Sequence, residues 1–294
     1  MWFRVEPHLL ARKAKEMKVT VLVENTATGD LQCEHGLSFF IEFQGENYLL
    51  DAGSTNMFME NAKTLGIPLP NVAKCILSHG HYDHAGGFVE FLEENKDACL
   101  FMMKTALREY YSASGGMHYI GVPKELVDRH EERFVCVDQV TEIGKGVYLI
   151  PHSTQGLEAI GEKAKLYVRR EGVACPDDFS HELSLVFDTE RGLVIFNSCS
   201  HGGVRNILEE VQKAFPNKKV SAFLGGLHMK GKEQGKEICT FTETEIQELI
   251  QYLKSIGLAH IYTGHCTGTL GLELLQRYGG NLVQELLTGK VIVL

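Results

Sequence analysis

The sequence predicts an α/β fold in which two β-rich halves pack as a sheet-on-sheet sandwich covered by helices. Three observations predict it: apolar β-type runs recur in both halves, helical patterns lie between them, and loops rich in His, Asp and Gly follow several strands. With 294 residues and 44% hydrophobic positions, the chain can bury a sizeable core. Because no linker or low-complexity run divides it, we expect a single domain over residues 1–294.

The first half of the chain is rich in strand patterns. Two β-type runs flank the turn at residues 44–47 and predict a hairpin. A helical pattern ends at Gly66-Ile67-Pro68, because Gly and Pro stop helices. The expected elements, in order, are a helix at Glu6–Met17, strands at Val19–Glu24, Leu37–Phe43 and Tyr48–Leu50, a helix at Asn56–Leu65, and strands at Lys74–Leu77 and Gly146–Ile150.

The second half repeats this plan of alternating strands and helices. We expect strands at Leu183–Phe187, Leu193–Asn197, Val220–Leu224 and Leu258–Tyr262, and helices at Val204–Phe215, at Thr242–Ile256 and from about Leu270. Two stretches lack a regular pattern: Pro151–Ser180, and Met229–Cys239 with its Lys and Gly residues. We interpret both as loop insertions near the edge of the sandwich where the strand-end loops gather.

Charge and composition exclude several classes of function. The chain has 29 basic and 38 acidic residues, a net charge of −9, so its overall field repels nucleic acids and anionic membranes. The N-terminus has no charged leader followed by an apolar core, and no run of about 18 apolar residues occurs. We therefore expect a cytoplasmic protein with a small-molecule substrate and neither a nucleic-acid nor a membrane partner; the oligomeric state stays open.

The eight Cys residues are scattered along the chain without a C-x-x-C pair. This spacing argues against a disulfide framework and against a Cys-rich zinc knuckle. We expect most of these residues to be small buried hydrophobic groups.

A dense cluster of polar residues follows the apolar run Lys74–Leu77, in the segment His79-Gly80-His81-Tyr82-Asp83-His84. Imidazole nitrogens and carboxylate oxygens are ligands that Zn²⁺, Fe²⁺ and Mn²⁺ accept. In an extended turn, alternate residues can face one ion while the next pair faces a second, and Gly80 lets the turn tighten. The segment predicts a metal site at a strand end, with a His-rich surface loop as the alternative.

This segment resembles the H-x-H-x-D-H signature of the metallo-β-lactamase superfamily. The resemblance implies an αββα four-layer metallo-β-lactamase sandwich with a binuclear metal site. It assigns His79 and His81 to the first metal, and Asp83 and His84 to the second. Asp51, in the run Leu49-Leu50-Asp51-Ala52-Gly53, matches the family's strand-end Asp that supports the metal loop from behind.

Four later segments, at residues 177–182, 197–203, 225–228 and 263–268, resemble one branch of that superfamily. The branch is named after a synthase that joins dihydropterin to a ribofuranosylaminobenzene phosphate, and the similarity spans roughly residues 19–294. Both His201 and His265 follow predicted strands, and the resemblance makes His201 a ligand of the first metal and His265 a ligand of the second. A local hydrogen bond or helix cap is the alternative for each.

Two positions leave alternatives open. The superfamily usually has a bridging Asp where this chain has Asn197-Ser198-Cys199. Either the Cys199 thiolate replaces that bridge, which would favour Zn²⁺, or Cys199 is an inert buried residue. His152, which follows a predicted strand, competes with His201 as the third His of the first metal.

Other residues are candidates for contacts with a substrate. His228 lies beyond strand Val220–Leu224 and, in a hydrolase, would donate a proton to the leaving group or contact the substrate. His181 and Glu182 precede a strand and would support or line the site, although Glu182 could equally be a surface charge. Several basic residues would either meet an anionic substrate or form a solvated surface: Lys230, Lys232, Arg205, Arg169 and Arg170.

The residues and the resemblance together predict a metallohydrolase that uses two divalent metal ions, Zn²⁺ first and Fe²⁺ or Mn²⁺ as alternatives. A metal-bound water would attack a carbonyl or phosphoryl centre of a small substrate, and Asp83 would orient it. The chain contains no P-loop, nucleophile elbow or dinucleotide-binding glycine motif. Three rivals remain: a pterin-related transferase or synthase on the same site, a mononuclear iron oxygenase, and a non-catalytic metal-binding sensory module.

Overall fold

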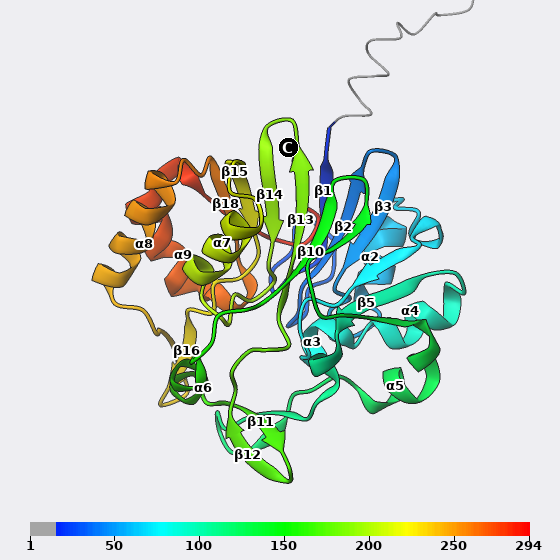
Figure 1. Ribbon diagram of the computed structural model, residues 1–294, viewed down its shortest axis with the longest axis horizontal. Coiled ribbons are helices and arrows are strands. Elements are labelled where there is room, and N and C mark those ends of the chain that lie inside the picture. Colours follow the sequence, from blue (N-terminus) through cyan, green and yellow to red (C-terminus); the bar gives the residue numbers. More distant parts are fainter. Residues whose placement is uncertain (1–15) are drawn as a thin grey trace, which may run out of the picture.

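Two large β-sheets form the centre of the molecule in the computed structural model, which describes residues 16–294 (Figure 1). The first sheet has the order β20 (Val291–Val293), β1 (Lys18–Val23), β2 (Ser38–Phe43), β3 (Glu46–Leu50), β4 (Lys74–Ile76), β5 (Cys99–Met103) and β8 (Phe134–Val137). The second has the order β19 (Val283–Glu285), β18 (His260–Thr263), β15 (Val220–Leu224), β14 (Gly192–Phe196), β13 (Leu183–Thr189), β10 (Val147–Pro151) and β9 (Thr141–Gly144).

The two sheets pack face to face through an apolar core that draws on both. Phe39 of β2 meets Phe196 of β14 edge to face, with ring centroids 5.5 Å apart. Phe187 of β13 meets Tyr48 of β3 in the same way at 5.5 Å. Most of these strands are buried on both faces, which is why they read in the sequence as continuous apolar runs rather than alternating ones.

Helices cover the outer face of each sheet and complete an αββα sandwich, as predicted. The first sheet carries α2 (Met57–Thr64), α3 (Tyr82–Ala85), α4 (Phe88–Glu94) and α5 (Lys124–His130). The second carries α7 (Val204–Ala214), α8 (Glu243–Ser255) and α9 (Gly268–Gly279). The short 3-10 turns are η1 (Leu69–Asn71), η2 (Lys104–Leu107), η3 (Glu131–Arg133), η4 (His265–Thr267) and η5 (Gly280–Leu282).

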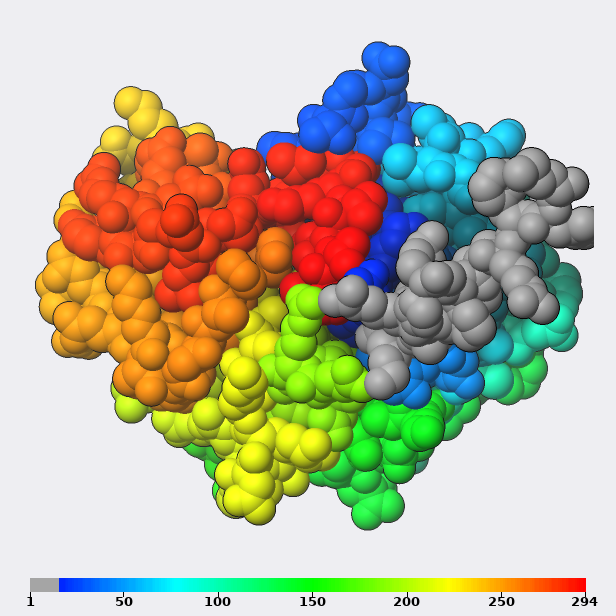
Figure 2. Space-filling view, turned by 90° about the horizontal axis from the view of Figure 1, so that it is seen from above, coloured from blue at the N-terminus to red at the C-terminus, as the bar shows by residue number. Residues whose placement is uncertain are grey.

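Parallel pairing brings several strand-end loops to one edge of the sandwich. Strands β14, β15 and β18 run parallel to one another, and β3 runs parallel to β4. The loops after these strands therefore leave the sheets at the same ends, as expected. Figure 2 shows the C-terminal segment, in red, beside the first strand, in dark blue, which agrees with the pairing of β20 and β1.

The predicted elements agree with the structure to within about two residues for most strands and helices. Helix α8 begins after a complete capping box, in which the Thr242 side chain and the Glu245 side chain each accept from the other's backbone. The helix predicted at Glu6–Met17 lies mostly outside the described residues, and Glu16 and Met17 are not helical.

The prediction that Pro151–Ser180 is irregular was wrong. This stretch forms α6 (Glu158–Ala164), β11 (Leu166–Arg170) and β12 (Val173–Pro176), and the two strands join β6 (Tyr110–Ser112) and β7 (His118–Tyr119) in a four-stranded sheet. Leu166 and Val168 alternate on β11 and pack in a separate small core with Tyr110 and Phe179. β11 and β12 form a local hairpin, and β11 also pairs with β6, some 50 residues earlier in the sequence.

The stretch Met229–Cys239 is also not a simple loop. It forms a two-stranded hairpin of β16 (Lys230–Glu233) and β17 (Lys236–Cys239). The turn residues Gln234 and Gly235 both have positive φ, 50° and 80°, as two-residue hairpin turns of type I′ require. Figure 1 shows β16, α6 and the β11–β12 hairpin at the lower end of the sandwich.

All eight Cys residues are free, which agrees with the predicted absence of a disulfide framework. The expectation that most are buried was wrong, because only Cys75, Cys199 and Cys266 are, while Cys33 and Cys136 are exposed. Among the described residues, no helix is both long and apolar enough to cross a membrane.

The residue directly after β15, Gly225, occupies a position that only glycine fits without strain. Its φ is +144°, and a Cβ added there would overlap the carbonyl oxygen of Asn197. Replacing Gly225 by Ala is expected to destabilise the fold by roughly 2–3 kcal/mol through overpacking and backbone strain. Denaturant unfolding measures the loss; Gly115→Ala, with φ +80° and open space around it, is the control and should cost about 1 kcal/mol. Equal losses in the two variants would refute the overlap.

Candidate metal centre

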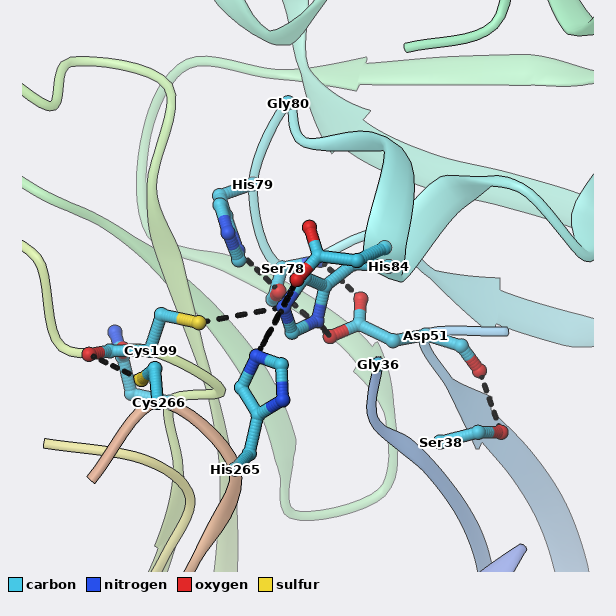
Figure 3. Close-up of polar contacts among 12 residues, drawn as sticks. Gly36, Ser38, Asp51, Ser78, His79, Gly80, His84, Cys199, His265 and Cys266 are labelled. Atoms are coloured by element: carbon cyan, nitrogen blue, oxygen red, sulfur yellow. Dashed lines mark hydrogen bonds and ion pairs between the residues drawn. The ribbon is translucent and has the colours of Figure 1, made fainter. Parts of the chain in front are cut away.

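The loop that follows β4 is anchored to the sheet by the buried carboxylate of Asp51. Its Oδ1 accepts from the Ser78 backbone N at 2.8 Å, and its Oδ2 accepts from Ser78 Oγ at 2.7 Å and from His84 Nδ1 at 2.7 Å. Figure 3 shows this carboxylate beside Ser78 and His84. Asp51 thus supports the loop from behind, as the resemblance implied, and it has a positive φ of 58°.

These contacts fix which ring nitrogens of the loop carry protons. Because His84 Nδ1 donates to Asp51, its Nε2 faces the cluster of His residues. The Ser78 hydroxyl gives its proton to Asp51 and lies 2.8 Å from His79 Nδ1, so it accepts from that nitrogen. Nδ1–H groups held by outer partners in this way are the usual arrangement of His residues that bind metals through Nε2.

Three buried His residues from two separate loops converge on a first centre. Nitrogen atoms of His79, His81 and His201 all lie within 4.8 Å of one another. Within the described part of the chain, Nε2 of His79, Nε2 of His81 and both ring nitrogens of His201 have no hydrogen-bond partner. Unpartnered buried nitrogens cost free energy unless something occupies the space between them, and a cation fits.

Burial keeps these three rings neutral, because it penalises the charged imidazolium. It lowers the pKa of His81 to about 3 and holds the pKa values of His79 and His201 well below the usual range, with neighbouring His residues adding to the effect. A neutral imidazole offers a lone pair, which is the form that metals bind.

A second group of donors lies beside the first and includes Asp83, His84 and His265. The Nε2 atoms of His84 and His265 are 3.2 Å apart, and Asp83 Oδ2 lies 3.7 Å from His84 Nε2 and 3.4 Å from His265 Nε2. The other ring nitrogen of His265 meets Asn25 Oδ1 at 3.0 Å, an oxygen that can only accept. When both rings are neutral, His84 and His265 therefore present two lone pairs to each other, an arrangement that a proton or a metal ion between them relieves.

The charges in this second group reinforce one another. Burial alone would lower the pKa of His84, but the carboxylates of Asp83 and Asp51 raise it to about 9. Burial would raise the pKa of Asp83, but the charges on His84 and His265 hold it well below its usual range. The group stabilises positive charge, whether a proton or a metal ion supplies it.

Two further buried carboxylates hold the turns that carry His201 and His265. Glu182 accepts from the backbone N of His201 at 2.9 Å and of Gly202 at 3.0 Å, and Glu24 accepts from the backbone N of His265. Burial raises the pKa of both carboxyl groups. Glu182 is therefore a buried support for the His201 turn and not a surface charge, which resolves the alternative left by the sequence.

His181 supports the first loop from the opposite side. Its Nδ1 accepts from the Gly80 backbone N at 2.9 Å, and its Nε2 donates to Asp177 Oδ2 at 3.0 Å. The two contacts occupy both ring nitrogens of this fully buried His residue. His181 thus fixes the turn that presents His79 and His81.

The structure brings His201 to the first centre and leaves the competing candidate, His152, outside it. His152 Nδ1 is held by Glu210 Oε2 at 3.0 Å, and no group of candidate ligands among residues 16–294 includes this residue. His228 lies against His201, with ring centroids 4.3 Å apart, and its Nδ1 is buried without a partner in the described residues. His228 therefore lies at the edge of the sandwich where the sequence predicted it.

One residue that the sequence analysis missed lies at the mouth of the site. His35 Nε2 is 3.2 Å from Asp83 Oδ2, its ring stacks on His265 at 5.0 Å, and its side chain is 55% exposed. It follows β1 in a loop with no motif of its own, so only the fold brings it to Asp83. His35 is the solvent-facing His residue of the second group.

Basic side chains that might meet an anionic substrate are mostly paired with acids. Arg205 lies 3.0 Å from Glu209, Arg169 lies 3.1 Å from Glu109, Arg170 lies 2.5 Å from Asp178 and Lys230 lies 3.6 Å from Glu237. These pairings favour the solvated-surface interpretation of the basic residues.

Comparisons with known proteins agree with this architecture. The family model of the metallo-beta-lactamase superfamily matches residues 31–133, which contain Asp51 and the whole His79–His84 segment. A relative from Methanocaldococcus jannaschii, named 7,8-dihydropterin-6-methyl-4-(beta-D-ribofuranosyl)-aminobenzene-5'-phosphate synthase, is 26% identical over 95% of this chain and 97% of its own length.

Solved structures give the same result. Tm1679, described as a metal-dependent hydrolase of the beta-lactamase superfamily, matches with a TM-score of 0.76 and 26% identity over 94% of this chain and 98% of its own. Zn²⁺-bound PqqB from Methylobacterium extorquens shares the fold, with a TM-score of 0.57 and 13% identity over 94% of this chain and all of its own, 100%. The chain therefore has the metallo-β-lactamase fold, and its residues 31–133 match the model of the metallo-beta-lactamase superfamily.

Proposed function

We propose that this chain is a hydrolase that uses two divalent metal ions, most favourably Zn²⁺. His79, His81 and His201 would hold the first ion, and Asp83, His84 and His265 the second. The observation that carries the proposal is that the Nε2 atoms of His84 and His265 face each other at 3.2 Å, beside three further buried His residues whose ring nitrogens have no partner within residues 16–294. Outer partners fix the rings in the orientation that metal binding needs.

The reaction that this donor set supports is attack of water on a carbonyl or phosphoryl centre. Bound divalent ions supply Lewis acidity, which lowers the pKa of water and polarises the group under attack. Asp83 would orient the attacking water, because its Oδ2 lies 3.4 Å from His265 Nε2 and 3.2 Å from the exposed His35. His228, whose Nδ1 has no partner among the described residues, would carry a proton to the leaving oxygen.

The relatives support a metal-dependent enzyme but differ in the reaction. Tm1679 is described as a hydrolase, whereas the relative from Methanocaldococcus jannaschii is named as a synthase. A pterin-related transferase on the same site is therefore the second candidate. Product analysis in ¹⁸O-labelled water separates the two, because only hydrolysis incorporates the label from water into the product.

The proposal is tested with the full chain loaded with Zn²⁺ and offered a panel of esters, lactones and phosphodiesters. We expect turnover of one of these classes that stops on chelation and returns when Zn²⁺ is added back. His228→Gln should lower kcat more than it raises KM and make the rate depend more steeply on leaving-group pKa, because the leaving oxygen would depart without a proton. His118→Gln, at an exposed residue on β7, should leave the rate unchanged. Stoichiometric metal binding with no turnover of the panel would refute the hydrolase and favour a sensory module.

A further inference from the structure

The mouth of the second group carries a hydrogen-bond acceptor that no residue between 16 and 294 occupies. We infer that this acceptor, Nδ1 of His35, binds a hydroxyl or N–H group of the substrate, so that the enzyme selects substrates with such a donor beside the bond under attack. The inference rests on the proposed metal-dependent function and names a chemical feature of its substrate. His35 is then a specificity-determining residue and not a metal ligand.

Asp83 determines which nitrogen of His35 carries the proton. A carboxylate accepts hydrogen bonds and cannot donate them. Asp83 Oδ2 lies 3.2 Å from His35 Nε2, so Nε2 carries a proton and donates a hydrogen bond to the carboxylate. Because a carboxylate has several lone pairs, Asp83 can accept this hydrogen bond and still bind a metal ion.

The His35 ring has no second proton when the site holds its metal ions. Two divalent cations in the adjoining groups oppose a further positive charge on the ring. A neutral imidazole has one proton, and with that proton on Nε2 the lone pair stays on Nδ1. Nδ1 has no hydrogen-bond partner in the part of the chain that the structure describes, and the side chain is 55% exposed. The lone pair is therefore open to a group that arrives from solvent.

Two contacts hold the His35 ring in this position. The ring stacks on His265, with the ring centroids 5.0 Å apart and the planes at 24° to each other. The His35 carbonyl oxygen accepts from the Ser54 hydroxyl, which fixes the backbone of this residue. An acceptor that is oriented before binding favours affinity, because little side-chain freedom is lost when the substrate arrives.

The loop that carries His35 is also tied to the second group. Asn25 Oδ1 accepts from the Gly36 backbone N at 3.3 Å and from His265 Nδ1 at 3.0 Å, so one oxygen holds both segments. A Cβ added to Gly36 would lie 2.7 Å from the Asp83 carbonyl oxygen, so the loop packs directly against the metal loop. The fold therefore sets the distance between the acceptor and the second group.

The surroundings of His35 favour a donor group over an anionic group of the substrate. The charged group in contact with the ring is the Asp83 carboxylate. The preceding residue, Glu34, adds a second carboxylate, which accepts from the Ser54 and Thr55 backbone N atoms, each at 3.0 Å. Two carboxylates and a lone pair repel a negative charge at this point, whereas a hydroxyl or N–H group gains a partner.

Two variants separate the acceptor from the ring. His35→Phe keeps a flat ring that can stack on His265 but has no acceptor. His35→Asn carries a carbonyl oxygen close to the position of Nδ1 and should rescue the interaction. His118→Phe is the control, because that exposed ring lies on β7 and has its own partner, the Gly116 carbonyl.

The test titrates the zinc-loaded full chain with acetohydroxamate and with N-methylacetohydroxamate, which bind zinc through the same two oxygen atoms. Only acetohydroxamate has an N–H group beside those oxygens. Isothermal titration calorimetry gives the ratio of the two dissociation constants. We expect the preference for acetohydroxamate to be about 3- to 10-fold greater in the wild-type protein than in His35→Phe, which is the worth of one net hydrogen bond. The preference should persist in His35→Asn and in His118→Phe.

Nitrogen-15 NMR of the same zinc-loaded protein gives a readout that needs neither a probe nor turnover. We expect the His35 ring to carry its proton on Nε2 and to have an Nδ1 that binds neither a proton nor zinc. The signals of this ring are identified by their absence from the spectrum of His35→Phe.

The outcomes separate this inference from the proposed function. Equal preferences for acetohydroxamate in the wild-type protein and in His35→Phe would overturn the substrate contact. A proton or a zinc ion on His35 Nδ1 would overturn it as well. In both cases two bound zinc ions would leave the proposed metal-dependent function intact, whereas absence of any bound zinc would overturn both.

Discussion

Replacing His81 by Ala is expected to remove the ion of the first centre and to lower kcat/KM by more than about 100-fold. Loss of a residue that only supports a metal ligand typically costs about 10- to 100-fold, and loss of a ligand should cost more. The reason is that His81 supplies one of the three nitrogens that converge there. Elemental analysis should fall from two ions per chain toward one, while circular dichroism and the unfolding midpoint of the metal-free protein stay close to the wild-type values.

Stability of the metal-free protein should survive this change because His81 Nε2 is buried without a partner among residues 16–294. Its removal relieves a desolvation cost of about 1–3 kcal/mol that offsets the lost packing. His118→Ala is the control, since that exposed ring is hydrogen-bonded only to the nearby Gly116 carbonyl. Retained metal and retained turnover in His81→Ala would overturn the assignment of the first centre.

Replacing Asp51 by Ala is expected to have the largest effect on stability, about 3–5 kcal/mol. Three donors then lose their acceptor in the interior: the Ser78 backbone N, Ser78 Oγ and His84 Nδ1. His84 would also lose the contact that turns its Nε2 toward the second centre. Denaturant unfolding of the metal-free protein measures the stability, and elemental analysis should show loss of the second ion.

Asp51→Asn separates charge from shape. An Asn amide directs an NH₂ group at one of the same donors, so this variant should also lose the second ion although its volume hardly changes. Asp188→Asn, which removes a partly exposed salt bridge to Lys218, is the control and should cost about 1 kcal/mol or less. If Asp51→Asn bound two ions and unfolded like Asp188→Asn, Asp51 would not be the anchor of the metal loop.

The sandwich could be predicted from the sequence because the signals for its strands and helices are local. Apolar runs such as Val220–Leu224 were predicted with their observed bounds, and the Thr242 capping box marks the start of α8. The His79–His84 segment is also local, since its four candidate ligands lie within six residues.

The rest of the site depends on contacts between distant segments. His35 carries no motif, and only the packing of its loop brings it to Asp83. His152 and His201 both follow strands, so the choice between them required the position of Glu210, which holds His152 away. The sheet that contains β11 also depends on a distant contact, because β11 pairs with β6 more than 50 residues earlier, although its hairpin with β12 is local.

Two metal centres require that imidazoles from three separate loops meet around two ions. An anomalous diffraction map recorded at the zinc edge from crystals of the unmutated protein tests this directly. We expect two peaks per chain, one at about 2.0–2.3 Å from the Nε2 atoms of His79 and His81 and a nitrogen of His201, the other at the same distance from Asp83, His84 and His265. A map with no peak, or with peaks that His201 and His265 do not contact, would contradict it.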